Sequence, residues 1–212
     1  MKTEKTTSYK IYDKKAKDKK KINILEEVFP RLPKKKFSII YADPPWHYNG
    51  KMQFDKSGKI DSNKDWKKNI FISAANFKYP TLKTSELKKL DIASISEENS
   101  LLFLWATNPH LEQAIDLGKS WGFEYRTVAF VWNKMVHNPG KYTMSYCELC
   151  LLFKRGKIPT PRGARNIKQL VNFPRSKHSE KPLVVANNIH EMFPEQKKIE
   201  LFARSKSKNW HA

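Results

Sequence analysis

Short apolar runs alternate along this chain with segments of helical period, and this alternation limits the fold more than any other feature. Apolar runs of six or seven residues indicate buried strands, and apolar residues spaced three or four apart indicate amphipathic helices. Strands that alternate with helices predict an α/β fold with a mostly parallel sheet that carries helices on both faces. The predicted strands are 37–42, 100–105, 127–132, 147–153 and 198–203, and the predicted helices are 85–90, 108–118 and 181–192.

The length of 212 residues suits one α/β domain with a full core. Residues 1–22 are mostly lysine and polar side chains, which predicts a flexible basic arm ahead of a domain at 23–212. Residues 47–78 form a long polar, lysine-rich insertion, which is separated from the end of the first predicted strand by four residues. Insertions of this length are usually functional or disordered, so we expect a recognition or gate loop there.

The formal net charge of +20 points to a polyanionic partner, and nucleic acid is the commonest one. The alternatives are a basic surface that only aids solubility and, for the arm, a solvated tail. No apolar run is long enough to span a bilayer, which predicts an intracellular protein without a membrane partner. Cys147 and Cys150 are three apart in a predicted strand, so they face opposite sides, and no metal site is expected from them.

The sequence Asp43-Pro44-Pro45-Trp46 follows the first apolar run, where two prolines end the strand because they have no N–H to donate. An adenine amine is a weak nucleophile, and an enzyme that methylates it must accept hydrogen bonds where positive charge develops. Asp43 and the Pro44 carbonyl can supply acceptors, and Trp46 can stack on an extruded base. The structural alternative is a strand-end turn with a capping Asp and a packing Trp.

Further along the chain, an ordered set of motifs resembles the MT-A70 family of adenine-N6 methyltransferases. The set comprises Asp43-Pro44-Pro45-Trp46, Tyr79-Pro80-Thr81-Leu82, Leu101-Leu102-Phe103-Leu104-Trp105, Trp121-Gly122-Phe123, Val131-Trp132-Asn133-Lys134, Glu148-Leu149-Cys150-Leu151, His178-Ser179-Glu180-Lys181-Pro182, Lys198 to Arg204, and Asn209-Trp210. The tetrad alone is moderately specific, whereas the whole ordered set is highly specific.

The resemblance implies a Rossmann-like methyltransferase fold in permuted order, with the catalytic tetrad ahead of the main cofactor-binding strand. It also implies S-adenosylmethionine as the cofactor. A lysine would pair with the carboxylate of this cofactor, and polar residues of the last strand and its exit loop would form hydrogen bonds with its ribose hydroxyls. The cofactor residues expected on this basis are Asp43, Lys181, Glu200, Arg204 and Asn209. A structural ion pair between Glu200 and Arg204 is compatible with that role.

Several residues around the tetrad are candidates for contact with the target base or its strand. They are Trp46, His47, Tyr48, Tyr79 and Lys134. His47 and Tyr48 could equally be surface loop residues, and Trp105 and Trp132 are expected to pack rather than to stack on bases. His178 is expected to donate a hydrogen bond from a loop rather than to bind a metal.

Three functions remain open at this point. The first is a DNA adenine-N6 methyltransferase, located in the cytoplasm of a bacterium or of a phage-infected cell. The second is an RNA N6-adenosine methyltransferase, nuclear if the source is eukaryotic. The third is a non-catalytic nucleic-acid-binding subunit, which the intact tetrad argues against. A homodimer and a heterodimer with a related subunit are both compatible with the resemblance, and the sequence does not fix the oligomeric state.

Overall fold

The computed structural model describes residues 32–47, 81–138, 142–175, 180–203 and 208–211. All of these except His47 and Thr81 belong to one compact unit, made of residues 31–46 and 82–212. The predicted arm at 1–22 and nearly all of the predicted 47–78 insertion lie outside the described residues.

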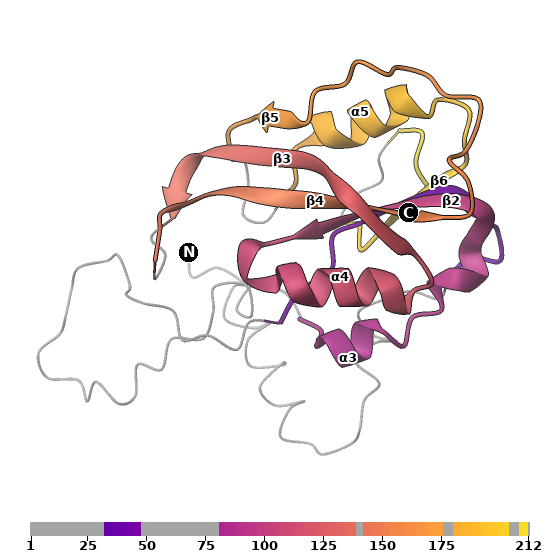
Figure 1. Ribbon diagram of the computed structural model, residues 1–212, viewed down its shortest axis with the longest axis horizontal. Helices are drawn as coiled ribbons and strands as arrows, with labels where there is room; N and C mark the ends of the chain where they lie inside the picture. The colour runs from indigo at the N-terminus through magenta and orange to yellow at the C-terminus, as the bar shows by residue number, and fades with distance from the viewer. Residues whose placement is uncertain (1–31, 48–80, 139–141, 176–179, 204–207, 212) are drawn as a thin grey trace, which may run out of the picture. The chain divides into compact units, whose positions relative to one another are not determined.

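The unit is built on a six-stranded sheet with the order β5-β3-β4-β2-β1-β6 (Figure 1). β1 pairs in parallel with β2 and with β6, and β3 pairs in parallel with β5. β4 is antiparallel to both β2 and β3, so five strands point one way and β4 alone points the other way. The strands are β1 (Phe37–Ala42), β2 (Ser96–Ala106), β3 (Glu124–Asn138), β4 (Ser145–Arg155), β5 (Leu170–Asn172) and β6 (Lys198–Leu201).

One face of the sheet is covered by α5 (Leu183–Met192), drawn in yellow in Figure 1. Val185, Ala186 and Ile189 form the buried side of this helix. They pack in one cluster with every second residue of the central strands, because side chains alternate across a sheet. The strand residues of this cluster are Ile39, Tyr41, Leu101, Phe103, Trp105, Phe130, Trp132, Cys150 and Val171.

The opposite face is covered by α4 (Leu111–Ser120), with α3 (Thr84–Leu87) beside it (Figure 1). Gly118 of α4 lies directly on the ring of Phe153, where an added methyl group would overlap the ring. Two short 3₁₀ turns, η2 (Ile92–Ile95) and η3 (Asn108–His110), lead into β2 and α4. In the part of the chain that the structure describes, no helix is long and apolar enough to cross a membrane.

The predicted strands and helices are present, although their ends differ: α3 stops at Leu87 and β3 runs from Glu124 to Asn138. β5 lies within 154–180, where the sequence indicated only a loop. β4 runs antiparallel because it follows β3 through a hairpin rather than a helical crossover. The predicted helix start at Asn108 is a 3₁₀ turn, whose first capping position is Thr107. Both cysteines lie on β4 as predicted, and Cys150 is fully buried.

Candidate active site

Charged side chains gather where the parallel strands end, on the face that α5 covers. Ile39 and Tyr41 of β1 face α5. Asp43 lies two residues beyond Tyr41, so the same alternation places its side chain on the α5 face. Lys134 of β3 is two residues beyond Trp132, and Glu148 of β4 is the register partner of Trp132. Alternation and register therefore bring these side chains together from three strands.

These three side chains and Lys181, which lies just before α5, form a continuous network of ion pairs. The Lys181 Nζ is 2.8 Å from Asp43 Oδ1 and 3.2 Å from Glu148 Oε2. The Lys134 Nζ is 3.5 Å from Glu148 Oε1. Two cations and two carboxylates balance one another, as charges that are largely withdrawn from water require.

The Lys181 ammonium lies over an aromatic floor. Its Nζ is 5.5 Å from the ring centroid of Trp105, whose indole N–H donates to the Tyr41 hydroxyl at 2.6 Å. Burial by itself lowers the pKa of Lys181, but the carboxylates of Asp43 and Glu148 outweigh burial and raise that pKa above its ordinary value. Lys181 is therefore a permanent cation at neutral pH.

Two weakly acidic groups below this network stay neutral. Burial is the main reason that the pKa of the Tyr41 phenol is raised, and Cys150 and Asp43 add to the shift. Burial also raises the pKa of the Cys150 thiol, with a further contribution from Asp43. Neither group carries a negative charge at neutral pH, so the anionic hydrogen-bond acceptors described at this edge of the sheet are the carboxylates.

The tetrad turns sharply after Asp43. The Trp46 amide donates to the Pro44 carbonyl at 2.8 Å, and the Leu82 amide donates to the Pro45 carbonyl at 2.8 Å. The second contact joins the turn to the segment that precedes α3 through a bridge between Trp46 and Leu82. The turn is thus held from both sides, and the Pro44 carbonyl oxygen keeps a second lone pair.

Trp46 is placed differently from its predicted role as a stacking surface for a base. Only 5% of Trp46 is exposed, and its indole N–H donates to the Trp105 carbonyl at 3.1 Å. Its ring stacks on His110 with centroids 5.5 Å apart. In this conformation Trp46 anchors the turn, which matches the structural alternative for that residue. Trp105 and Trp132 pack in the core, as predicted.

The predicted cofactor residues are only partly brought together. Glu200 of β6 is the register partner of Tyr41, two residues from Asp43, and its charge acts on the Tyr41 phenol. The amide of Asn209 is 3.2 Å from the imidazole of His190, in the last turn of α5, and the ring of the next residue, Trp210, has its centroid 5.5 Å from that of Tyr41. Lys181 precedes the first turn of that ten-residue helix, which is about 15 Å long. Asn209 thus contacts the end of α5 away from Lys181, and its part in the cofactor site stays a prediction.

Three further candidates cannot be placed, because Tyr48, Tyr79 and Arg204 lie outside the described residues. His47 is described, and its Nδ1 is 2.8 Å from the Thr81 hydroxyl. Lys134, predicted to reach the substrate, is 5% exposed and belongs to the ion network.

Glu148 was missed as a site residue by reasoning from the sequence. The available signal was a carboxylate inside the otherwise apolar segment 147–153. Glu148 meets Lys134 because β4 pairs with β3, and it meets Lys181 because of where α5 packs. Neither contact can be predicted from the residues next to Glu148 in the sequence.

The network offers a ligand both signs of charge. Lys181 can pair with a carboxylate, and Asp43 and Glu148 can accept from an ammonium or an amine. A carboxylate has about four lone-pair directions, so the ion pair with Lys181 leaves acceptor capacity on Asp43. This donor and acceptor set suits an amino acid group beside an amine.

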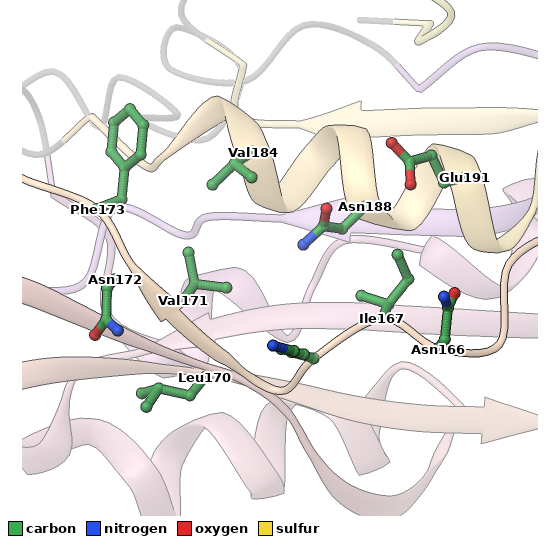
Figure 2. A pocket seen from close by; sticks show the side chains of 10 residues that line it. Asn166, Ile167, Leu170, Val171, Asn172, Phe173, Val184, Asn188 and Glu191 are labelled. Atoms are coloured by element: carbon green, nitrogen blue, oxygen red, sulfur yellow. The ribbon is translucent and has the colours of Figure 1, made fainter.

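A separate pocket of about 390 Å³ lies between α5 and residues 166–173 (Figure 2). Val184 and Asn188 project into it from α5, opposite Ile167 and Val171. Of the described site residues, none is among those that line this pocket.

Comparison with known proteins assigns this arrangement to a family. The family model described as MT-A70 matches residues 37–212. The chain is 59% identical over 206 residues to the Type II methyltransferase M.MunI of Mycoplasma sp. The aligned region covers 97% of this chain and 88% of that protein.

Two eukaryotic proteins are more distant and much longer. The N(6)-adenosine-methyltransferase MT-A70-like protein of Drosophila melanogaster is 24% identical over 80% of this chain and 24% of its own length. The N(6)-adenosine-methyltransferase subunit METTL3 of Danio rerio is 25% identical over 80% of this chain and 26% of its own length.

Proposed function

Because the chain belongs to the MT-A70 family, we propose that it transfers a methyl group from S-adenosylmethionine to the N6 amine of adenine in nucleic acid. The observation that carries this proposal is the Asp43 carboxylate, fixed by Lys181 at the end of β1 and followed directly by the Pro44-Pro45 turn. We also propose the permuted Rossmann-like order, in which the tetrad precedes the strands and helix that complete the cofactor site.

The proposed chemistry needs acceptors aimed at the amine. S-adenosylmethionine would supply its methyl group to the N6 nitrogen, with a C–N bond formed, a C–S bond broken and the extra proton leaving the nitrogen afterwards. Asp43 and the Pro44 carbonyl accept hydrogen bonds from the amine as its positive charge develops, which lowers the barrier. Lys181 holds the Asp43 carboxylate in place before the reaction, so little reorganisation is needed.

The residues present fit S-adenosylmethionine. When bound, this cofactor supplies an electrophilic methyl group on a sulfonium. Lys181 would pair with its carboxylate, Asp43 would accept from its ammonium, and Glu200 on the adjacent strand would accept from the ribose hydroxyls. The permanent charge of Lys181 is the feature that suits a carboxylate-bearing ligand. Arg204 remains a proposed contributor.

DNA is the polymer that we favour. The relative with 59% identity is named a Type II methyltransferase, a term used for enzymes that modify DNA, and its source favours the bacterial cytoplasm for this chain. RNA is the alternative, because the two distant relatives are named N(6)-adenosine-methyltransferases.

The direct test is methyl transfer from labelled S-adenosylmethionine to matched DNA and RNA, each single- and double-stranded, followed by nucleoside analysis. We expect label in N6-methyladenine, with more in DNA than in RNA. Label only in N6-methyladenosine of RNA would select the alternative polymer. Label in another nucleoside, or in none, would contradict the proposed function.

A further inference from the structure

The outer end of the β3–β4 hairpin concentrates exposed apolar side chains. Half of the ten large hydrophobic residues that are exposed in the described part of the chain lie between residues 135 and 146. We call these five the tip surface: Met135 (60% exposed), Val136 (49%), Tyr142 (89%), Met144 (49%) and Tyr146 (48%). Clusters of this kind usually mark a contact surface.

The hairpin extends past its neighbours in the sheet. The register of β2 with β4 ends at Ala106 and Leu149, and that of β3 with β5 ends at Asn133 and Asn172. β3 and β4 still pair at Asn138 and Ser145, beyond both of those limits. In Figure 1 the paired ends of these two strands accordingly run out past the end of β2.

The tip surface begins beside the candidate active site. Lys134 is buried in the ion network, and the next residue, Met135, is among the most exposed apolar residues. Met135 has a φ of 56°, a left-handed conformation that is uncommon for a residue with a long side chain. Its amide donates to the Asn133 side chain at 3.0 Å, so the backbone is held at this bend. Such irregularities in strands re-aim side chains next to active sites.

The charge of this segment favours a polyanion over another protein surface. Residues 127–147 contain no acidic residue, although the chain as a whole has 21 among 212. A stretch of 21 residues without a carboxylate, in a chain of net charge +20, can approach phosphates without repulsion.

We propose that the tip surface is a wedge that inserts into a nucleic acid duplex next to the target adenine. This inference rests on the proposed function. An enzyme that methylates a base in a duplex must extrude that base, which leaves a gap in the stack. Apolar side chains that enter between base steps, and aromatic rings that stack on bases, fill such gaps. The tip surface supplies both aliphatic side chains and aromatic rings. It lies next to the ion network, which would receive the extruded base.

The test compares duplex DNA with the same strands separated, because only the duplex requires extrusion. The variant is Met135→Ser combined with Tyr142→Ser, and the matched control is Ile158→Ser combined with Leu170→Ser, two exposed apolar residues outside the tip surface. We expect the tip variant to lose at least tenfold in methylation rate on duplex DNA and less than twofold on single strands. A mismatch opposite the adenine that the wild type methylates, which lowers the cost of extrusion, should restore most of the rate.

Three outcomes would overturn the wedge while the proposed function stands: wild-type activity confined to single strands, equal rates for the tip variant and the control, or equal losses on both substrates. If sedimentation shows that those equal losses accompany a change in oligomeric state, the tip surface is a protein interface instead. Wild-type protein that methylates no DNA would overturn the proposal of DNA methylation and the wedge together.

Discussion

At the scale of single residues, Lys181 organises the charge at the strand ends. It pairs with Asp43 and Glu148 from a position just before α5, and the ring of Trp105 lies below it. A lysine at the start of a helix is opposed by the helix dipole, so its retention there is explained by these partners and by the proposed cofactor carboxylate.

Replacing Lys181 with methionine should weaken the binding of S-adenosylmethionine. The substitution keeps most of the apolar stem but removes a charged hydrogen bond, which is typically worth about 1.5–3 kcal/mol, or roughly tenfold to a hundredfold in affinity. Calorimetry of the purified variant measures this directly, with Lys168→Met on an exposed lysine as the control. Unchanged affinity in Lys181→Met would remove Lys181 from the proposed cofactor site.

The same variant should show how the Lys181 charge depends on pH. The pKa of Lys181 is raised in the folded chain by Asp43 and Glu148, against the opposing effect of burial. A raised lysine pKa stabilises the fold fully below the unfolded pKa, and this contribution is lost as pH rises through the folded pKa. The difference in unfolding free energy between wild type and Lys181→Met should therefore be constant from about pH 7 to about pH 9 and shrink only above about pH 10.5. A change centred near pH 8 would contradict the assigned charge state.

At the scale of elements, the sequence predicted those strands and helices whose position is set by residues close to them in the chain. The apolar run of β1 ends at two prolines, and Pro182 opens α5. β5 was missed because it has three residues, two of them exposed, and forms only by pairing with β3. Asp43 and Lys181 were identified from motifs, whereas the pairing of Glu148 with Lys134 and Lys181 depends on strand register that no local segment encodes.

The contact of α4 with the sheet gives a stability prediction. Gly118→Ala adds a methyl group where the ring of Phe153 already lies. Overpacking of a core typically costs about 1–3 kcal/mol, which exceeds the gain of up to about 1 kcal/mol in helix propensity. We expect a lower midpoint in urea unfolding and partial recovery when Phe153→Leu is added.

The exposed α4 residue Gln113, changed to alanine, is the control for this measurement and should stay within about 0.5 kcal/mol of wild type. If Gly118→Ala instead raises the midpoint, helix propensity outweighs the overlap and α4 packs less closely on β4 than the structure shows.

At the scale of the whole molecule, the charge and the site point to the same substrate class. A net charge of +20 predicts a polyanion, and the resemblance to the MT-A70 family is confirmed by the match over residues 37–212. Charge does not distinguish DNA from RNA, because phosphate contacts are common to both. Residues 1–20 contain eight of the lysines and three acidic residues, which agrees with a basic arm. Because this segment lies outside the described residues, the arm stays a prediction.

The measurement that tests the central claim most directly is the single-turnover rate of N6-methyladenine formation by Asp43→Asn, at saturating DNA and S-adenosylmethionine. Asparagine keeps the shape of the side chain but removes its charge, and Asp116→Asn on the surface of α4 is the control. Loss of a preorganised acceptor at the reacting group typically lowers the rate on the order of a hundredfold or more. We predict a fall of that size for Asp43→Asn and a wild-type rate for Asp116→Asn. An Asp43→Asn rate close to that of wild type would contradict the claim that this carboxylate acts on the adenine amine.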